Sequence, residues 1–244
     1  MWRSLLCLWV SVLAGPWAGA ETLRIGFGTD KPPYIFEAER RGVEYDIVVE
    51  AAKMAGMTVE PFFAPMERLH YMQGRGELDG IASTNPAGGL KAFFSKSYIE
   101  YHNVAVALAD RRLEIKTIGD LGKYSVSAFQ RARKLLGPEF EAMAEKNPNY
   151  REEAQQITRN RLLYGERVDV IIGDRRIIEY FTGSISQQMN VRRPLVWYAL
   201  FPPTPYSVAF GQESVRNRFD RGLETLRAGD GYHEIEKRYR SSVQ

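Results

Sequence analysis

The chain has 244 residues, with 33 Lys and Arg against 30 Asp and Glu, and one cysteine. Its formal net charge of +3 and its basic pairs dispersed among acids form no concentrated cationic stripe, which disfavours nucleic acid as a partner. At about 150 residues per domain, the length predicts one large domain or two small ones.

The first twenty residues predict a cleavable export signal. Arg3 provides the positive start, residues 5–13 are apolar, and small residues at 18–20 precede the expected cleavage before Glu21. The apolar stretch is much shorter than the roughly 20 residues that cross a bilayer. Cys7 lies inside this stretch and follows a leucine, whereas a lipid-attachment cysteine would end the stretch and follow a small residue. We therefore expect a protein exported to the periplasm, not a lipoprotein, whose mature form has no disulfide.

Short β-rich runs alternate with segments of helical periodicity through the rest of the chain. Predicted strands cover residues 23–27, 58–63, 78–83, 104–108, 124–128 and 168–172. Helices are predicted at 46–55, capped by Asp46 and ended by Gly56, at 67–73, at 215–226 and at 232–239. The alternation predicts an α/β fold with largely parallel sheets.

Two segments interrupt this alternation. Residues 137–156 are polar and contain Pro138 and Pro148, which predicts a surface helix and a loop without chemistry. Residues 201–205, Phe-Pro-Pro-Thr-Pro, are too rigid and too poor in N–H donors for a central strand. We interpret them as a crossing between domains.

A series of short motifs has a characteristic order and spacing. They are Pro32-Pro33-Tyr34, Gly42 to Ile47, Ala64 to Leu69, Gly76 to Gly80, Phe94 to Tyr98, Ile118 to Leu121, Gly165 to Asp174 and Gly231 to Ile235. In this order the chain resembles the bacterial extracellular solute-binding proteins of family 3, the polar amino-acid type. The resemblance covers almost the whole chain after the export signal.

The resemblance implies a type II periplasmic-binding fold, with two α/β lobes that each have a central, mostly parallel sheet and are joined by two crossing strands. Lobe 1 would comprise residues 21–105 and the return segment 198–244, and lobe 2 would comprise residues 106–197. The ligand would lie in the cleft between them, where closure excludes water and strengthens polar contacts.

The resemblance also implies roles for three positions. Asp174 stands where the family's acid accepts a ligand ammonium, and Tyr34 stands where an aromatic lies against the ligand. Gly88 falls on the arginine that grips the ligand carboxylate in members that hold α-amino acids. Either another cation, such as Arg68, Lys91 or Arg131, takes this task, or the ligand is not a standard α-amino acid.

Further donors follow predicted strands. Ser83, Thr84 and Asn85 offer hydroxyl, amide and backbone groups, and the amides near Gln130 and Arg131, where a strand enters a helix, can face an anion. Each candidate also has a structural interpretation, such as a helix N-cap for Asp174 or an exposed ion pair for Arg68. The predicted ligand-binding residues are Tyr34, Arg68, Ser83, Thr84, Asn85, Gln130, Arg131 and Asp174.

Three functions fit this pattern. The first is a monomeric periplasmic protein that captures a small polar molecule, an amino acid or a related compound, for the permease of an ABC transporter. The second is a sensor that docks on a membrane receptor, and the third is an enzyme resembling cyclohexadienyl dehydratase, with Glu44, Glu67 or Asp174 as acid or base. The sequence has no hydrolase, zinc-protease or phosphate-loop motif, and its histidines are scattered. We therefore expect a binder, not an enzyme, with no metal and no cofactor.

Overall fold

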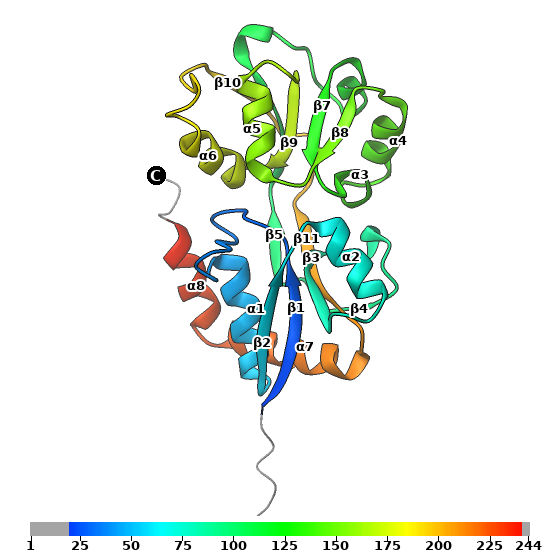
Figure 1. The fold of residues 1–244 in the computed structure, drawn as a ribbon, viewed down its shortest axis with the longest axis vertical. Helices are drawn as coiled ribbons and strands as arrows, with labels where there is room; N and C mark the ends of the chain where they lie inside the picture. The colour runs from blue at the N-terminus through cyan, green and yellow to red at the C-terminus, as the bar shows by residue number, and fades with distance from the viewer. Residues whose placement is uncertain (1–19, 241–244) are drawn as a thin grey trace, which may run out of the picture.

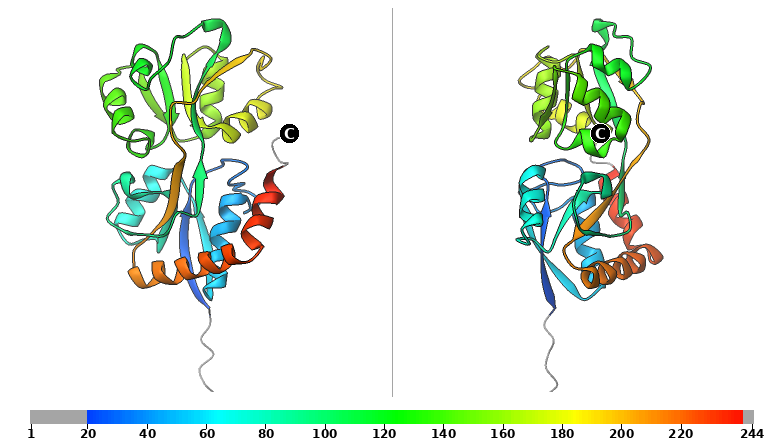
Figure 2. Two further views of the ribbon diagram at one scale, coloured as in Figure 1. Left: turned by 180° about the vertical axis from the view of Figure 1, so that it is seen from behind. Right: turned by 90° about the vertical axis from the view of Figure 1, so that its right-hand side faces the viewer.

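The computed structural model describes residues 20–240, so the predicted export signal lies outside the described residues. These residues fold into two α/β lobes, one above the other in Figure 1, and the expected fold class is confirmed. Two extended connections run between the lobes, and Figure 2 shows them from behind and from the side. Among the described helices, none combines the length and the apolar character that a membrane crossing requires.

Lobe 1 is built on a sheet with the strand order β2-β1-β3-β11-β4, and β5 pairs with the other end of β11. Its strands are β1 (Glu21–Phe27), β2 (Met57–Phe63), β3 (Gly80–Thr84), β4 (Phe93–Phe94), β5 (Ile99–Tyr101) and β11 (Thr204–Phe210). Strands β2, β1 and β3 are parallel, and β11 returns antiparallel to β3. Its helices are α1 (Val43–Met54), α2 (Met66–Gly74), α7 (Glu213–Ala228) and α8 (Gly231–Arg240).

Lobe 2 is built on a second sheet with the order β10-β6-β9-β7-β8. Its strands are β6 (Asn103–Leu108), β7 (Val126–Phe129), β8 (Tyr150–Glu153), β9 (Val170–Asp174) and β10 (Leu195–Tyr198). Its helices are α3 (Ala132–Leu135), α4 (Pro138–Lys146), α5 (Gln156–Tyr164) and α6 (Arg175–Ser184). Strands β9, β7 and β8 are parallel, whereas β6 and β10 pair antiparallel. In both lobes the strands that lead to or from a crossing therefore break the parallel pattern.

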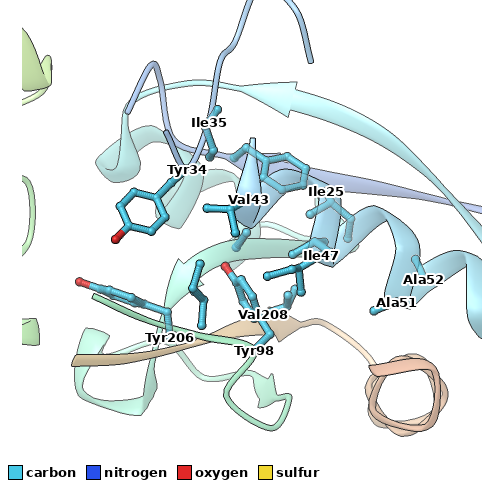
Figure 3. Close-up of a cluster of buried hydrophobic side chains, with 14 of the residues drawn as sticks. Ile25, Tyr34, Ile35, Val43, Ile47, Ala51, Ala52, Tyr98, Tyr206 and Val208 are labelled. Carbon is cyan, nitrogen blue, oxygen red and sulfur yellow. The ribbon is translucent and has the colours of Figure 1, made fainter. Parts of the chain in front are cut away.

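Each lobe has its own apolar core. In lobe 1, alternate side chains of β1 such as Ile25 pack against Ile47 of α1 and Val208 of β11 (Figure 3). In lobe 2, Phe140 of α4 is fully buried against strand residues such as Val126. Burial of apolar area at about 25 cal/mol per Å² stabilises each lobe separately. The lobe 1 cluster also includes Leu135, Ile177 and Phe181 of lobe 2, so apolar contacts join the two lobes as well.

Helix α1 begins three residues earlier than the sequence predicts. Its N-cap is Gly42, and Asp46 lies inside the first turn, where its carboxylate accepts hydrogen bonds from the Tyr239 hydroxyl at 2.8 Å and from Arg238. The predicted cap was wrong because the carbonyls of Pro33 and Tyr34 accept the first-turn amides, so no side-chain cap is needed.

The polar segment 137–156 was also only partly predicted. Helix α4 forms as expected, but the chain then continues as strand β8 and pairs in parallel with β7. This strand lies at the edge of the lobe 2 sheet and carries Arg151, Glu152 and Glu153. Charged residues are common on edge strands. Because they interrupt the apolar alternation by which strands are recognised, β8 was not predicted from the sequence.

Candidate functional site

A cavity of about 50 Å³ lies between the two lobes. Lobe 1 and the crossing strands line it with Lys31, Ser83, Tyr101, Asn103 and Tyr206, and lobe 2 lines it with Phe129, Gln130, Leu135, Gln156, Asp174 and Ile177. The volume exceeds the roughly 10–15 Å³ that one water molecule needs. The cavity therefore has room for a molecule of several non-hydrogen atoms.

Asp174 stands at the end of β9 and caps α6. One carboxylate oxygen, Oδ1, accepts the amide of Arg176 at 2.9 Å, and the other, Oδ2, accepts the amide of His102 at 2.8 Å and the Tyr34 hydroxyl at 3.1 Å. The side chain is buried, and burial raises the pKa of Asp174 even though these hydrogen bonds oppose the rise. Asp174 is therefore both the N-cap of α6 and part of the cavity lining.

Three tyrosines form an aromatic wall on the lobe 1 side. The rings of Tyr34 and Tyr101 stack with centroids 4.0 Å apart, and Tyr101 meets Tyr206 edge-on at 4.8 Å. Figure 3 shows the hydroxyls of Tyr34 and Tyr206 pointing away from the apolar side chains of the core. Of the three, Tyr101 and Tyr206 line the cavity, and Tyr34 supports Tyr101 from behind.

A buried ion pair lies beside this wall. Lys31 Nζ lies 2.9 Å from Glu44 Oε2, and both side chains are buried. The Ser83 hydroxyl bonds both partners, and the hydroxyls of Tyr98 and Tyr101 donate to the carboxylate. Burial raises the pKa of Glu44, but the Lys31 charge and the hydrogen bonds from Ser83 and Tyr101 outweigh it, so the net pKa is lowered and Glu44 is charged.

Ser83 reaches this ion pair through a local irregularity of strand β3. Its φ angle is 57°, in the left-handed region that non-glycine residues seldom adopt, and the pairing register of β3 and β11 shifts at the same point. The bulge interrupts the alternation of side chains along the strand. Ser83 therefore bonds Lys31 and Glu44 although its neighbours Ala82 and Thr84 are buried in the lobe.

Arg131 joins the lobes but does not line the cavity. Its Nη1 donates to both carboxylate oxygens of Glu67 at 3.1 Å, and its Nη2 donates to the carbonyl of Gly88. The amide of Arg131, at a position where the sequence suggested that amides could face an anion, donates to Glu152 at 2.6 Å, and the amide of Arg133 donates to the same carboxylate at 3.1 Å. These amides are therefore already hydrogen-bonded to a carboxylate of the protein and do not face a ligand.

Gly88 lies in a confined position. A Cβ atom added there would lie 2.8 Å from Thr84 Oγ1 and 3.4 Å from His70 Cε1. Thr84 is fully buried and lies outside the cavity lining. The side chains of Thr84 and His70 crowd this position, so a cationic side chain here could enter the cleft only if they shifted.

The remaining predicted residues lie apart from the cavity. Asn85 accepts the Ala87 amide at 3.0 Å and caps the short helix Pro86–Gly88. Arg68 is exposed, with its guanidinium 5.8 Å from the centroid of the Phe62 ring, and Lys91 is exposed as well. Of the eight predicted residues, the structure thus brings Ser83, Gln130 and Asp174 to the cavity.

Sequence reasoning missed several residues that line the cavity. Lys31, Tyr101, Asn103 and Tyr206 were not proposed, and Gln156 falls in the segment predicted to carry no chemistry. Tyr101 and Tyr206 belong to β5 and β11, which lead into the crossings. The predicted crossing between the domains could have indicated these residues, because a ligand between the lobes also lies beside the strands that join them.

Arg159 is a fully buried cation behind the cavity wall. A Cβ at Gly173 would lie 2.9 Å from its Nη2, which donates to the Gln156 side chain. Its Nε and Nη1 have no hydrogen-bond partner among the described residues. Burial lowers the pKa of Arg159 to about 10, and the charges of Glu153 and then Asp174 oppose this shift. Within residues 20–240, no three His, Cys, Asp or Glu side chains are grouped to hold a metal ion.

The chain is similar in sequence to one protein family and similar in fold to several solved structures. The family model of the bacterial extracellular solute-binding proteins, family 3, matches residues 23–242. A histidine kinase sensor domain with similarity to periplasmic binding proteins superposes with a TM-score of 0.75 at 20% identity, covering 91% of this chain and 97% of the other. An ancestral arginine-binding protein bound to arginine gives 0.74 at 18% identity, with 91% and 100% covered.

A third similar structure is an ancestral amino acid-binding protein described as a precursor of cyclohexadienyl dehydratase. It gives a TM-score of 0.69 at 18% identity, covering 89% of this chain and 95% of the other. No curated protein matches the sequence. At these identities the three structures support the two-lobed fold alone.

Proposed function

Because the chain belongs to the bacterial extracellular solute-binding proteins, family 3, we propose that it captures a small polar molecule between its lobes and presents it to a membrane ABC transporter. One observation carries this proposal: a single cavity receives polar side chains from both lobes, such as Lys31 from lobe 1 and Asp174 and Gln130 from lobe 2. A molecule that contacts both sets favours the closed arrangement of the lobes. Closure excludes water and strengthens the hydrogen bonds made inside.

The two lobes are also joined directly by polar contacts of modest strength. Besides the bonds from Tyr34 to Asp174 and from Arg131 to Glu67 and to the Gly88 carbonyl, Arg176 Nη2 donates to the Tyr239 carbonyl at 2.7 Å. Two longer contacts add to these: the Glu67 amide donates to Gln130 Oε1 at 3.4 Å, and Thr29 Oγ1 donates to the Ala154 carbonyl at 3.5 Å. Neutral hydrogen bonds and half-exposed ion pairs each contribute about 1 kcal/mol, and a hydrogen bond to a charged acceptor such as Asp174 contributes about 1.5–3 kcal/mol. A ligand can therefore shift the balance between open and closed forms.

A thermal-shift screen tests this binding function. Amino acids, amines, organic acids and short peptides are added separately to the purified mature protein. A ligand present at 100 times its Kd stabilises the folded state by about 2.7 kcal/mol, and we expect at least one solute to do so and to reduce the radius of gyration in small-angle scattering. A screen in which no solute raises the melting temperature or changes the radius contradicts the proposal.

Transport is tested in cells. We propose that the protein works as a monomer in the periplasm after its signal is removed, and that deletion of its gene abolishes uptake of the solute found in the screen. If the deletion leaves uptake normal but abolishes a transcriptional response to the solute, the protein is a sensor. The similarity to a histidine kinase sensor domain is the reason to test this second role. Recovery of the bound solute unchanged after long incubation is expected of a binder and not of an enzyme.

A further inference from the structure

The charges that line the cavity suggest which solutes it accepts. Among the described residues, the ionisable side chains in its lining other than tyrosines are Lys31 and Asp174. Lys31 is already paired with Glu44 at 2.9 Å. A carboxylate brought within about 3 Å of Lys31 would stand within roughly 6 Å of Glu44, whose repulsion cancels much of the attraction. Lys31 therefore does not replace the cation that is missing at Gly88.

The other groups that would hold a carboxylate are engaged elsewhere. The Arg131 guanidinium binds Glu67 and the Gly88 carbonyl, and the amides of Arg131 and Arg133 bind Glu152. Position 88 is a glycine and offers no cation, and a side chain there would press against Thr84 Oγ1. Arg159 has two N–H groups without a partner among the described residues, but it is fully buried behind Gly173 and does not line the cavity. A ligand carboxylate entering this cavity would therefore lose its water without gaining a strong partner, which disfavours its binding.

Of the two charged side chains that line the cavity among the described residues, Lys31 has an ionic partner in Glu44, whereas no cation donates to Asp174. Asp174 is buried and lines the cavity, and its donors are three backbone amides and one tyrosine hydroxyl, none of which carries a positive charge. Arg159 lies behind Gly173, and the first charge that acts on it is Glu153, with Asp174 second. A cation placed in the cavity would therefore complete the solvation of Asp174.

We propose, on the basis of the proposed binding function, that the ligand is a small amine without a carboxylate, with its ammonium at Asp174 and its carbon body against Tyr101, Tyr206 and Phe129. The electron-rich ring faces of these residues also attract a cation. Lys31 has three N–H donors, of which Glu44 and Ser83 take two. The third donor fits a neutral acceptor on the ligand, such as a hydroxyl or a carbonyl oxygen.

Pairs of ligands that differ by one carboxylate test this inference in the unmodified protein. Ethanolamine is compared with serine, putrescine with ornithine, agmatine with arginine and tyramine with tyrosine, each by calorimetric titration. In at least one pair the amine should bind with a Kd at least tenfold lower than that of its amino acid. Equal or tighter binding of the amino acid overturns the inference and leaves the binding function intact.

A result in which none of the four amines binds also overturns the inference. The binding function itself is then decided by the wider screen, because organic acids and peptides are present there and absent here. The two failures are therefore distinguishable.

The substitution Asp174→Asn tests the position of the ammonium. Asparagine keeps the N-cap of α6, so the fold should be retained and checked by its melting temperature. We expect the affinity for the amine to fall at least tenfold in this variant. Glu179→Gln removes a carboxylate from the same helix outside the cavity lining and should leave the affinity unchanged. Equal amine affinity in wild type and Asp174→Asn overturns the proposal.

Discussion

The Tyr34 hydroxyl of lobe 1 donates to Asp174 Oδ2 of lobe 2 at 3.1 Å, and both side chains are buried. This bond joins the lobes next to the cavity. Burial, first, and the nearby Asp174 charge raise the pKa of Tyr34 well above its ordinary value, so the hydroxyl remains a donor at neutral pH. Tyr34 thus contributes to closure and to the solvation of the carboxylate.

Tyr34→Phe should therefore weaken ligand binding without disturbing the fold. The phenyl ring can keep the stack on Tyr101, whereas the lost bond to a charged acceptor is worth about 1.5–3 kcal/mol. We expect the Kd measured by titration to rise at least tenfold. Tyr232→Phe is a matched control, because its hydroxyl donates to the Tyr98 carbonyl within lobe 1. Similar affinities for Tyr34→Phe and the control variant would show that the bond between lobes does not matter.

The pair formed by Glu67 and Arg131 should act as a weak latch. The Glu67 side chain is 57% exposed, so the pair contributes up to about 1 kcal/mol and is screened by salt. Glu67→Gln should shift the ligand-free protein toward the open form, seen as a larger radius of gyration in low salt. The difference from wild type should shrink at high salt. Glu179→Gln, which breaks a pair with Arg175 inside α6, should leave the radius unchanged.

Arginine at position 88 should not convert the protein into an α-amino acid binder. Even a Cβ atom there approaches Thr84 Oγ1 to 2.8 Å, and Thr84 is fully buried. Overpacking of this kind costs about 1–3 kcal/mol. We expect Gly88→Arg to lower the melting temperature and to gain no affinity for arginine or glutamine. A variant that binds either amino acid with a new micromolar Kd would show that the loop can open.

The fold could be predicted from the sequence because its signals are local. The spacing of apolar residues such as Ile25, Ile47 and Val48 predicts strand β1 and helix α1. In the folded protein the same residues are buried in the core. The start of α1 was mispredicted because the groups that cap it are carbonyls of a preceding loop, which carry no sequence signature.

The site could be predicted only where one residue has a recognisable context. Asp174 ends a buried strand before a helix, and that pattern is visible in the sequence. Lys31 gives no comparable signal, because its role depends on Glu44 thirteen positions later and on Ser83 at a bulge in β3. These three side chains come together only when the sheet has formed, so no local sequence pattern indicates their contact.

His70 should make the stability of the protein depend on pH. Its side chain is buried beside Gly88, and its Nε2 has no hydrogen-bond partner among residues 20–240. Burial, first, and the Arg131 charge lower the pKa of His70 to about 4. The folded protein therefore keeps this imidazole neutral, whereas the unfolded chain protonates it below about pH 6.5.

Stability should be fully present above about pH 6.5 and should fall as the pH drops toward 4, because the unfolded state binds the extra proton in this window. The loss is at most about 3 kcal/mol, from 1.36 kcal/mol per pKa unit. Urea unfolding at pH 4.5, 5.5, 6.5 and 7.5 measures it, and His70→Gln should flatten the dependence relative to wild type. His233→Gln, at an exposed position, should not. The Glu44 pKa is lowered, so its contribution to stability is lost as the pH falls below its ordinary value of about 4.3. The Asp174 pKa is raised, so its effect has the opposite sign and adds stability as the pH falls. The difference between wild type and His70→Gln therefore isolates the histidine. Parallel curves for wild type and His70→Gln would show that another group binds the proton.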